Sequence, residues 1–170
     1  MNPISIFCLV SLLSLGLNQI PQVHGDLISS TCSKALYKDL CEKTLRADSS
    51  SSGAKVDGLA KIALKAASSS AKSIQGQITT LLKTGKDKAV VAALKDCSEN
   101  YSGANEQLGD SLKAMVAKRY SDVNTWVTAA MTDGDSCEDG FKSGTSPLTK
   151  ANTNFSQLCS NVLAITNQLS

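Results

Sequence analysis

The most reactive side chains of this 170-residue chain are those of six cysteines and a single histidine. Cysteine thiols form structural disulfides in oxidising compartments, whereas in reducing ones they more often bind metals or act as nucleophiles. The chemistry of these cysteines therefore depends on where the protein resides, and the beginning of the chain bears on that question.

The N-terminal segment is typical of a secretory signal peptide. Its apolar run, residues 4–17, is too short to cross a bilayer comfortably and is followed by polar residues. Small side chains at Val23 and Gly25 suit cleavage by a signal peptidase after Gly25. We therefore predict a signal peptide over residues 1–25 and a mature chain over residues 26–170 that is secreted and has no membrane partner.

Loss of the signal peptide would remove Cys8 and the only histidine, His24. Without histidine the mature chain has no Ser-His or Cys-His nucleophile and no histidine zinc site. Its acidic residues fall on predicted helix faces, in turns or at the N-terminus. We predict that the protein is not an enzyme and has no catalytic residue, metal site or cofactor. The remaining cysteines, one of which must stay unpaired, are Cys32, Cys41, Cys97, Cys137 and Cys159.

Four stretches after residue 55 have apolar residues at every third or fourth position, which is the pattern of helices with one buried face. The joints between them are short, and no stretch has the alternation of a strand. We predict an all-α fold in which residues 56–170 form an antiparallel up-down four-helix bundle. The predicted helix starts are Val56, Asp87 as an N-cap, Ser121 or Asp122, and Ser146 as an N-cap followed by Pro147.

Helix geometry limits how the cysteines can pair. In one continuous helix Cys32 and Cys41 would lie about 13 Å apart on opposite sides, whereas a disulfide needs the Cα atoms within roughly 7 Å. They can bond only if the chain bends near residues 36–39. Residues 26–55 are therefore predicted to be a helical hairpin and a Ser-rich linker outside the bundle.

The bundle cysteines have two pairings that fit an antiparallel arrangement. Cys97 and Cys137 lie at about equal distances in sequence before and after the joint that follows the second bundle helix. Cys137 and Cys159 lie at equal distances before and after the next joint. Residues at equal distances from a turn face each other in antiparallel helices, so both pairs pass this test. Spacing leaves the choice open, and Cys32 and Cys41 remain partners of each other.

Charge is distributed unevenly along the mature chain. Residues 26–95 contain twelve basic and six acidic residues, whereas residues 96–139 contain three and nine. In the acidic segment Glu99, Glu106 and Asp110 recur on one helix face. A bond between Cys97 and Cys137 would place Ser136 and Asp139 beside that face. Basic residues are interleaved with acids and few aromatics accompany them, so we expect no nucleic-acid partner.

Two N-glycosylation sequons occur in the mature chain. They are Asn100-Tyr-Ser102 and Asn154-Phe-Ser156, and both lie on predicted helices. A glycan at Asn100 would crowd the acidic face, whereas Asn154 belongs to the last helix.

Four segments of the mature chain are informative when taken together: TCSKALYKDLCEKTL from Thr31, LRADSSSSGAKVDGLA from Leu45, LKDCSENYSGANEQLG from Leu94 and SCEDGF from Ser136. They resemble segments of the plant inhibitors of pectin methylesterase and of invertase, with the closer likeness to the former. The likeness extends in order over the whole mature chain. It implies a four-helix bundle preceded by a disulfide-closed N-terminal helical hairpin, with bonds Cys32–Cys41 and Cys97–Cys137 and a free Cys159. We expect this free thiol to be a small buried hydrophobe.

The resemblance also implies a function. It suggests an inhibitor in the apoplast or cell wall that binds pectin methylesterase, as a 1:1 complex, and covers the pectin cleft. The contact residues that the resemblance suggests are Glu99, Glu106, Ser136 and Asp139. We add Asp110, which lies on the same helix face as Glu99 and Glu106. Gly103 departs from the pattern, because an acid can occupy that position in such inhibitors.

Two other functions remain as alternatives. Invertase inhibitors share the fold, but those that resemble this chain carry a Pro-Lys-Phe segment at the joint between the second and third bundle helices. Here that joint reads Arg119-Tyr-Ser-Asp-Val123, which favours pectin methylesterase over cell-wall or vacuolar invertase. A ligand-carrying or defence bundle without an enzyme target is the third alternative.

Overall fold

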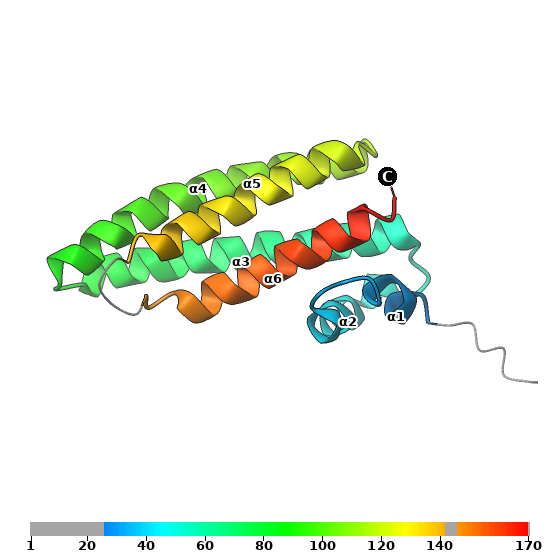
Figure 1. Cartoon of the computed structure of the whole chain (residues 1–170), viewed down its shortest axis with the longest axis horizontal. Helices are drawn as coiled ribbons and strands as arrows, with labels where there is room; N and C mark the ends of the chain where they lie inside the picture. The colour runs from blue at the N-terminus through cyan, green and yellow to red at the C-terminus, as the bar shows by residue number, and fades with distance from the viewer. Residues whose placement is uncertain (1–25, 142–145, 170) are drawn as a thin grey trace, which may run out of the picture.

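The structure, a computed structural model, describes residues 26–141 and 146–169. The predicted signal peptide lies outside the described residues. The part that is described is helical, without strands, and confirms the all-α prediction (Figure 1). Its elements are α1 Leu27–Cys32, α2 Lys38–Ala47, the 3-10 helix η1 Ser49–Ser51, α3 Val56–Thr84, α4 Lys88–Val116, α5 Tyr120–Asp139 and α6 Thr149–Thr166.

Helices α3 to α6 form the four-helix bundle, and α1 and α2 form the hairpin beside it (Figure 1). α3 packs against α4 and α6, and α5 packs against the same two helices. α3 and α5 therefore occupy diagonal corners. The buried faces are mostly aliphatic and alanine-rich, as the apolar periodicity predicted.

Among the bundle helices, only α4 begins after a residue whose side chain caps it. The Asp87 side chain accepts hydrogen bonds from the backbone N–H groups of Ala89 and Val90, so α4 begins where it was predicted. α5 begins at Tyr120, one residue before the predicted range. The predicted start of α6 at Ser146 is wrong. Ser146 accepts a hydrogen bond from the Leu148 N–H in a turn that buries Leu148 completely, and α6 begins only after this turn.

The hairpin is closed by the Cys32–Cys41 disulfide, whose Cα atoms are 5.7 Å apart. The chain bends between α1 and α2, at the place that the cysteine spacing required. Two amide side chains of α6 and its C-terminal end fasten the hairpin to the bundle. Asn161 donates to the Tyr37 carbonyl at 3.1 Å, and Gln168 donates to the Thr31 carbonyl at 3.0 Å. The hairpin is therefore held to α6 by hydrogen bonds as well as by packing.

Gly134 on α5 is a close-packing point of the bundle core. The rings of Tyr101 and Phe155 meet here at 5.5 Å between centroids. A Cβ atom on Gly134 would lie 3.0 Å from Phe155 Cδ1 and 3.3 Å from the Tyr101 hydroxyl. Only glycine therefore lets α5 approach this aromatic pair so closely.

We expect Gly134→Leu to lower the free energy of unfolding by about 1–3 kcal/mol, because the new side chain must displace both rings. Gly76→Ala is the matched control, since nothing lies within 4 Å of a Cβ at that helical position. It should raise stability by up to about 1 kcal/mol. Urea denaturation measures both values, and an unchanged midpoint for Gly134→Leu would contradict the packing described.

None of the helices in the described part of the chain is both long enough and apolar enough to span a membrane.

Candidate functional site

A disulfide joins α4 to α5 near one end of the bundle. The Cα atoms of Cys97 and Cys137 are 4.5 Å apart, which confirms the pairing that the family resemblance implied. Cys159 on α6 is free and completely buried. Burial raises the pKa of its thiol to about 12, so it stays protonated and behaves as a small apolar side chain.

The predicted contact residues lie on the two cross-linked helices. Glu99 and Glu106 are exposed on α4, and Ser136 and Asp139 are exposed on α5. Asp110 is half-buried and forms an ion pair with Lys113, with 2.8 Å between Asp110 Oδ1 and Lys113 Nζ. It is therefore less available to a partner than the other acids. We call Glu99, Glu106, Asp110, Ser136 and Asp139 the acidic surface.

A polar network that runs from the core to the surface supports the end of α5. The Tyr101 hydroxyl donates to Asn152 Oδ1 at 2.7 Å, and Asn152 Nδ2 donates to Glu138 Oε2 at 2.5 Å. The Thr149 hydroxyl also donates to Glu138. Burial raises the pKa of Tyr101, which keeps its hydroxyl a donor. The segment that carries Ser136 and Asp139 is therefore fixed by α6 as well as by the disulfide.

The structure adds Asp133, which the sequence did not single out. A Cβ atom on Gly103 of α4 would lie 3.0 Å from Asp133 Oδ2, so the Asp133 carboxylate covers the place where a side chain of residue 103 would begin. Asp133 thus brings an acidic side chain from α5 over this position of α4. Gly103 lies six residues after Cys97, and Asp133 lies four residues before Cys137, so the two positions lie almost opposite each other in antiparallel helices. Counting along both helices from the disulfide could therefore have found Asp133.

The environment of Asp133 disfavours its charged form. Burial raises the pKa of the Asp133 carboxyl, and the hydrogen bond to Gln107 opposes this rise only in part. Its Oδ2 atom is buried with no hydrogen-bond partner among the described residues. Ionisation of Asp133 is therefore less favourable in the folded chain than in the unfolded chain.

We expect Asp133→Asn to raise the free energy of unfolding at neutral pH. Because the folded-state pKa is raised above the unfolded one, stability is highest while Asp133 is protonated and falls as pH rises through the folded pKa. The gain from Asn should therefore disappear toward acidic pH. Denaturation curves at several pH values measure this effect, with the exposed neighbour Asp135→Asn as control; equal profiles for both variants would contradict the assignment.

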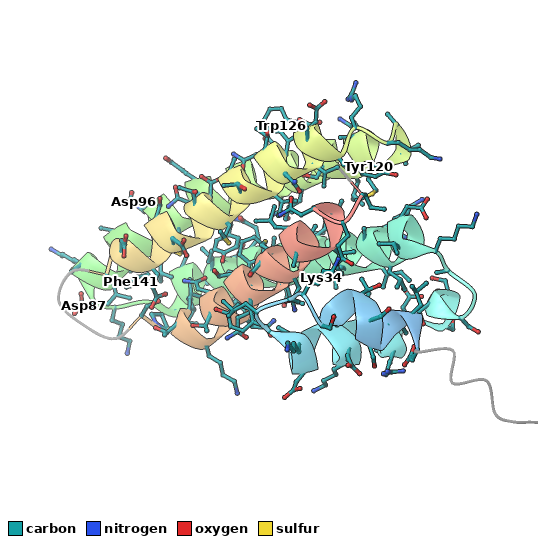
Figure 2. The ribbon with its side chains drawn as sticks, turned by 45° about the vertical axis from the view of Figure 1, so that its right-hand side comes forward. Lys34, Asp87, Asp96, Tyr120, Trp126 and Phe141 are labelled. Carbon is teal, nitrogen blue, oxygen red and sulfur yellow. A yellow bond between two sulfur atoms is a disulfide. The ribbon has the colours of Figure 1, made fainter. Side chains whose placement is uncertain are left out.

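Trp126 is the second residue that the predicted set of contact residues omitted. It is the single tryptophan of the chain and is 40% exposed. It lies seven residues before Asp133 and so shares the side of α5 that adjoins α4. Figure 2 shows it at the outer edge of α5. A half-exposed tryptophan is the residue type most enriched among energetically important contacts in protein complexes.

The two sequons differ in accessibility. Asn154 is exposed on α6, whereas Asn100 is half-buried on α4 beside Glu99. Their occupancy stays a prediction.

Within residues 26–141 and 146–169, no group of three or more His, Cys, Asp and Glu side chains is arranged to hold a metal ion.

Comparison with known proteins gives consistent results. The family model described as plant invertase/pectin methylesterase inhibitor matches residues 26–165. A Platanus orientalis protein named as an invertase inhibitor is 33% identical over 156 residues, which cover 86% of this chain and 92% of that protein. A pectinesterase inhibitor from Actinidia deliciosa is 31% identical over 166 residues, which cover 95% and 90%.

Solved structures show the same fold. A mutant form of a pectin methylesterase inhibitor from Arabidopsis superposes with a TM-score of 0.72 at 24% identity, covering 84% of this chain and 97% of that one. A second crystal structure of an Arabidopsis thaliana pectin methylesterase inhibitor gives a TM-score of 0.65. At this identity the likeness establishes the architecture of the bundle.

Proposed function

Because the chain belongs to the plant invertase/pectin methylesterase inhibitor family, we propose that it inhibits pectin methylesterase by laying its acidic surface across the pectin-binding cleft. The family is one of enzyme inhibitors, so its members act on enzymes by binding them. The observation that carries the proposal is the position of Glu99, Glu106, Ser136 and Asp139 on two helices that a disulfide holds together.

The dimensions of α4 and α5 suit steric occlusion. α4 has 29 residues and α5 has 20, which correspond to about 43 Å and 30 Å of helix. A stable protein interface buries about 800 Å² per partner. A flat face of two packed helices of this length is large enough to bury such an area and to exclude a polymer from a groove. One such face per molecule gives a 1:1 complex.

The joint between α4 and α5 supports the choice of target. It contains Lys118 with a φ of 55° and leads through Arg119 into α5, without a Pro-Lys-Phe segment. Relatives named for both targets match the chain at similar identity, 33% and 31%, so the names alone do not favour either enzyme. Cell-wall or vacuolar invertase is therefore the second candidate target.

The proposed site of action is the apoplast. It rests on the predicted signal peptide at residues 1–25, which would deliver the inhibitor domain, residues 26–170, to the cell wall where pectin is located. In the oxidising secretory pathway both disulfides can form.

Inhibition assays with three enzymes test the proposal. The oxidised mature chain is titrated against pectin methylesterase, cell-wall invertase and vacuolar invertase, and light scattering after gel filtration gives the stoichiometry of any complex. We expect inhibition of pectin methylesterase alone, with a 1:1 complex. Inhibition of invertase alone would overturn the choice of target, and inhibition of none of the three would favour a ligand-carrying or defence role.

A further inference from the structure

The solvent side of α3 carries a row of lysines that the proposed inhibition does not use. Lys61, Lys65, Lys72 and Lys83 are all exposed. At 100° per residue these four positions lie within about 40° of one another around the helix axis. The first and last are separated by about 33 Å along the helix. We call these four residues the lysine row.

The positive charge of the lysine row is largely uncompensated. α3 contains a single acidic residue, Asp57, in its first turn. The ion pairs found among the described residues are formed by Arg46, Lys113 and Arg119, and none involves the lysine row. Lys65 of the row acts on the nearby Asp48: hydrogen bonds from Ser50 lower the pKa of this carboxyl most, and the charge of Lys65 adds a small contribution.

The side chains around the lysine row indicate the class of anion that would bind there. α3 contains no arginine, the residue whose planar fork suits phosphate groups. It contains no aromatic residue on which nucleic-acid bases could stack, and its exposed positions carry only Lys, Ser, Thr, Gln and Gly, with no apolar side chain for a membrane. Isolated ammonium groups separated by hydroxyl side chains suit a flexible chain with many carboxylates and hydroxyls.

We propose that the lysine row binds de-esterified pectin, a polysaccharide with a carboxylate on each uronic acid. Hydrolysis of a methyl ester leaves such a carboxylate, so the polymer recognised here is the product of the enzyme named as the target. The choice of this polymer rests on the proposed function, whereas binding of a carboxylate polymer depends on α3 alone. Attachment through α3 leaves the exposed residues of the acidic surface, which lie on α4 and α5, free for the enzyme.

Binding of the oxidised mature chain to polygalacturonate tests the proposal. We expect retention on immobilised polygalacturonate at low ionic strength, release by about 0.5 M salt because exposed charges are screened, and no retention on fully methyl-esterified polymer. The test variant changes all four lysines of the row to glutamine and should bind at least about tenfold more weakly, since each exposed contact contributes up to about 1 kcal/mol. The matched control removes four exposed lysines of the hairpin and α6: Lys34→Gln, Lys38→Gln, Lys43→Gln and Lys150→Gln.

The outcomes separate this proposal from its rivals. Equal weakening in both variants would show that net charge alone holds the polymer, and equal retention on the esterified polymer would exclude carboxylate recognition; either result overturns the proposal. Tighter binding to duplex DNA or to anionic vesicles than to polygalacturonate would also overturn it. Circular dichroism confirms that both variants are folded. The lysine-row variant should inhibit pectin methylesterase normally, so failure of inhibition and failure of polymer binding are distinguishable.

Discussion

The Glu99→Lys/Glu106→Lys variant is expected to bind pectin methylesterase at least about 100-fold more weakly than the unchanged chain. Both side chains are exposed on α4, seven residues and about 10.5 Å apart, and neither forms an ion pair with a described residue. Their replacement therefore leaves the fold intact and reverses the charge at the centre of the acidic surface. Like charges brought together in an interface cost several kcal/mol, and each 1.4 kcal/mol is a tenfold change in affinity.

Inhibition constants at low and high salt measure this effect. The matched control, Asp39→Lys/Asp57→Lys, makes the same change in net charge on α2 and α3, away from the acidic surface. It should inhibit within about threefold of the unchanged chain, since charges at the surface but outside an interface contribute little to binding. Equal losses in both variants would show a non-specific effect of net charge, and no loss in either would remove Glu99 and Glu106 from the contact.

Local signals in the sequence were sufficient for most of the fold. The bundle helices follow from apolar periodicity, and the start of α4 was predicted at the right residue because Asp87 caps two backbone N–H groups. The start of α6 was predicted wrongly because Ser146-Pro147 is equally suitable for a turn. The burial of Leu148, which decides between turn and helix, depends on contacts with distant parts of the chain.

The disulfide pairing shows what spacing cannot decide. Distance from a joint fixes how far along its helix a residue lies, but it does not say which neighbouring helix that residue faces. Cys137 satisfied the spacing test with Cys97 and with Cys159, and family resemblance was needed to choose between them. The structure has Cys137 bonded to α4, whereas Cys159 is free within the core.

Asp133 was missed for a related reason. In the sequence of α4, Gly103 interrupts a series of acidic residues on one helix face. The sequence of α4 alone does not show which side chain of α5 lies over this position. The contact between the Gly103 position and the Asp133 carboxylate exists only once α4 and α5 are packed in register. The Cys97–Cys137 bond joins the two helices in this register and also joins the two parts of the acidic surface, so loss of the cross-link bears directly on the site.

Removal of the α4–α5 disulfide by Cys97→Ala/Cys137→Ala is expected to lower the free energy of unfolding by about 4 kcal/mol. The bond closes a loop with a sequence separation of 40, and the entropy that a cross-link removes from the unfolded chain grows with loop length. The Cys32→Ala/Cys41→Ala variant is the matched control, because it also removes two buried sulfur atoms. Its disulfide closes a much shorter loop, with a sequence separation of 9. The same relation gives about 2.7 kcal/mol for this short loop.

Inhibition separates the two variants further. Loss of the α4–α5 bond leaves the end of α5 that carries Ser136 and Asp139 held by α6 but no longer cross-linked to α4. The affinity of this variant for pectin methylesterase should therefore fall even at temperatures where the variant remains folded. Loss of the hairpin bond leaves α4 and α5 joined, and its affinity should stay close to that of the unchanged chain. Chemical denaturation gives the stabilities and titration of the enzyme gives the affinities. A greater loss of affinity in the hairpin variant than in the α4–α5 variant would place the contact on α1 and α2. A contact surface on α4 and α5 should depend more on the bond between these two helices than on the bond in the hairpin.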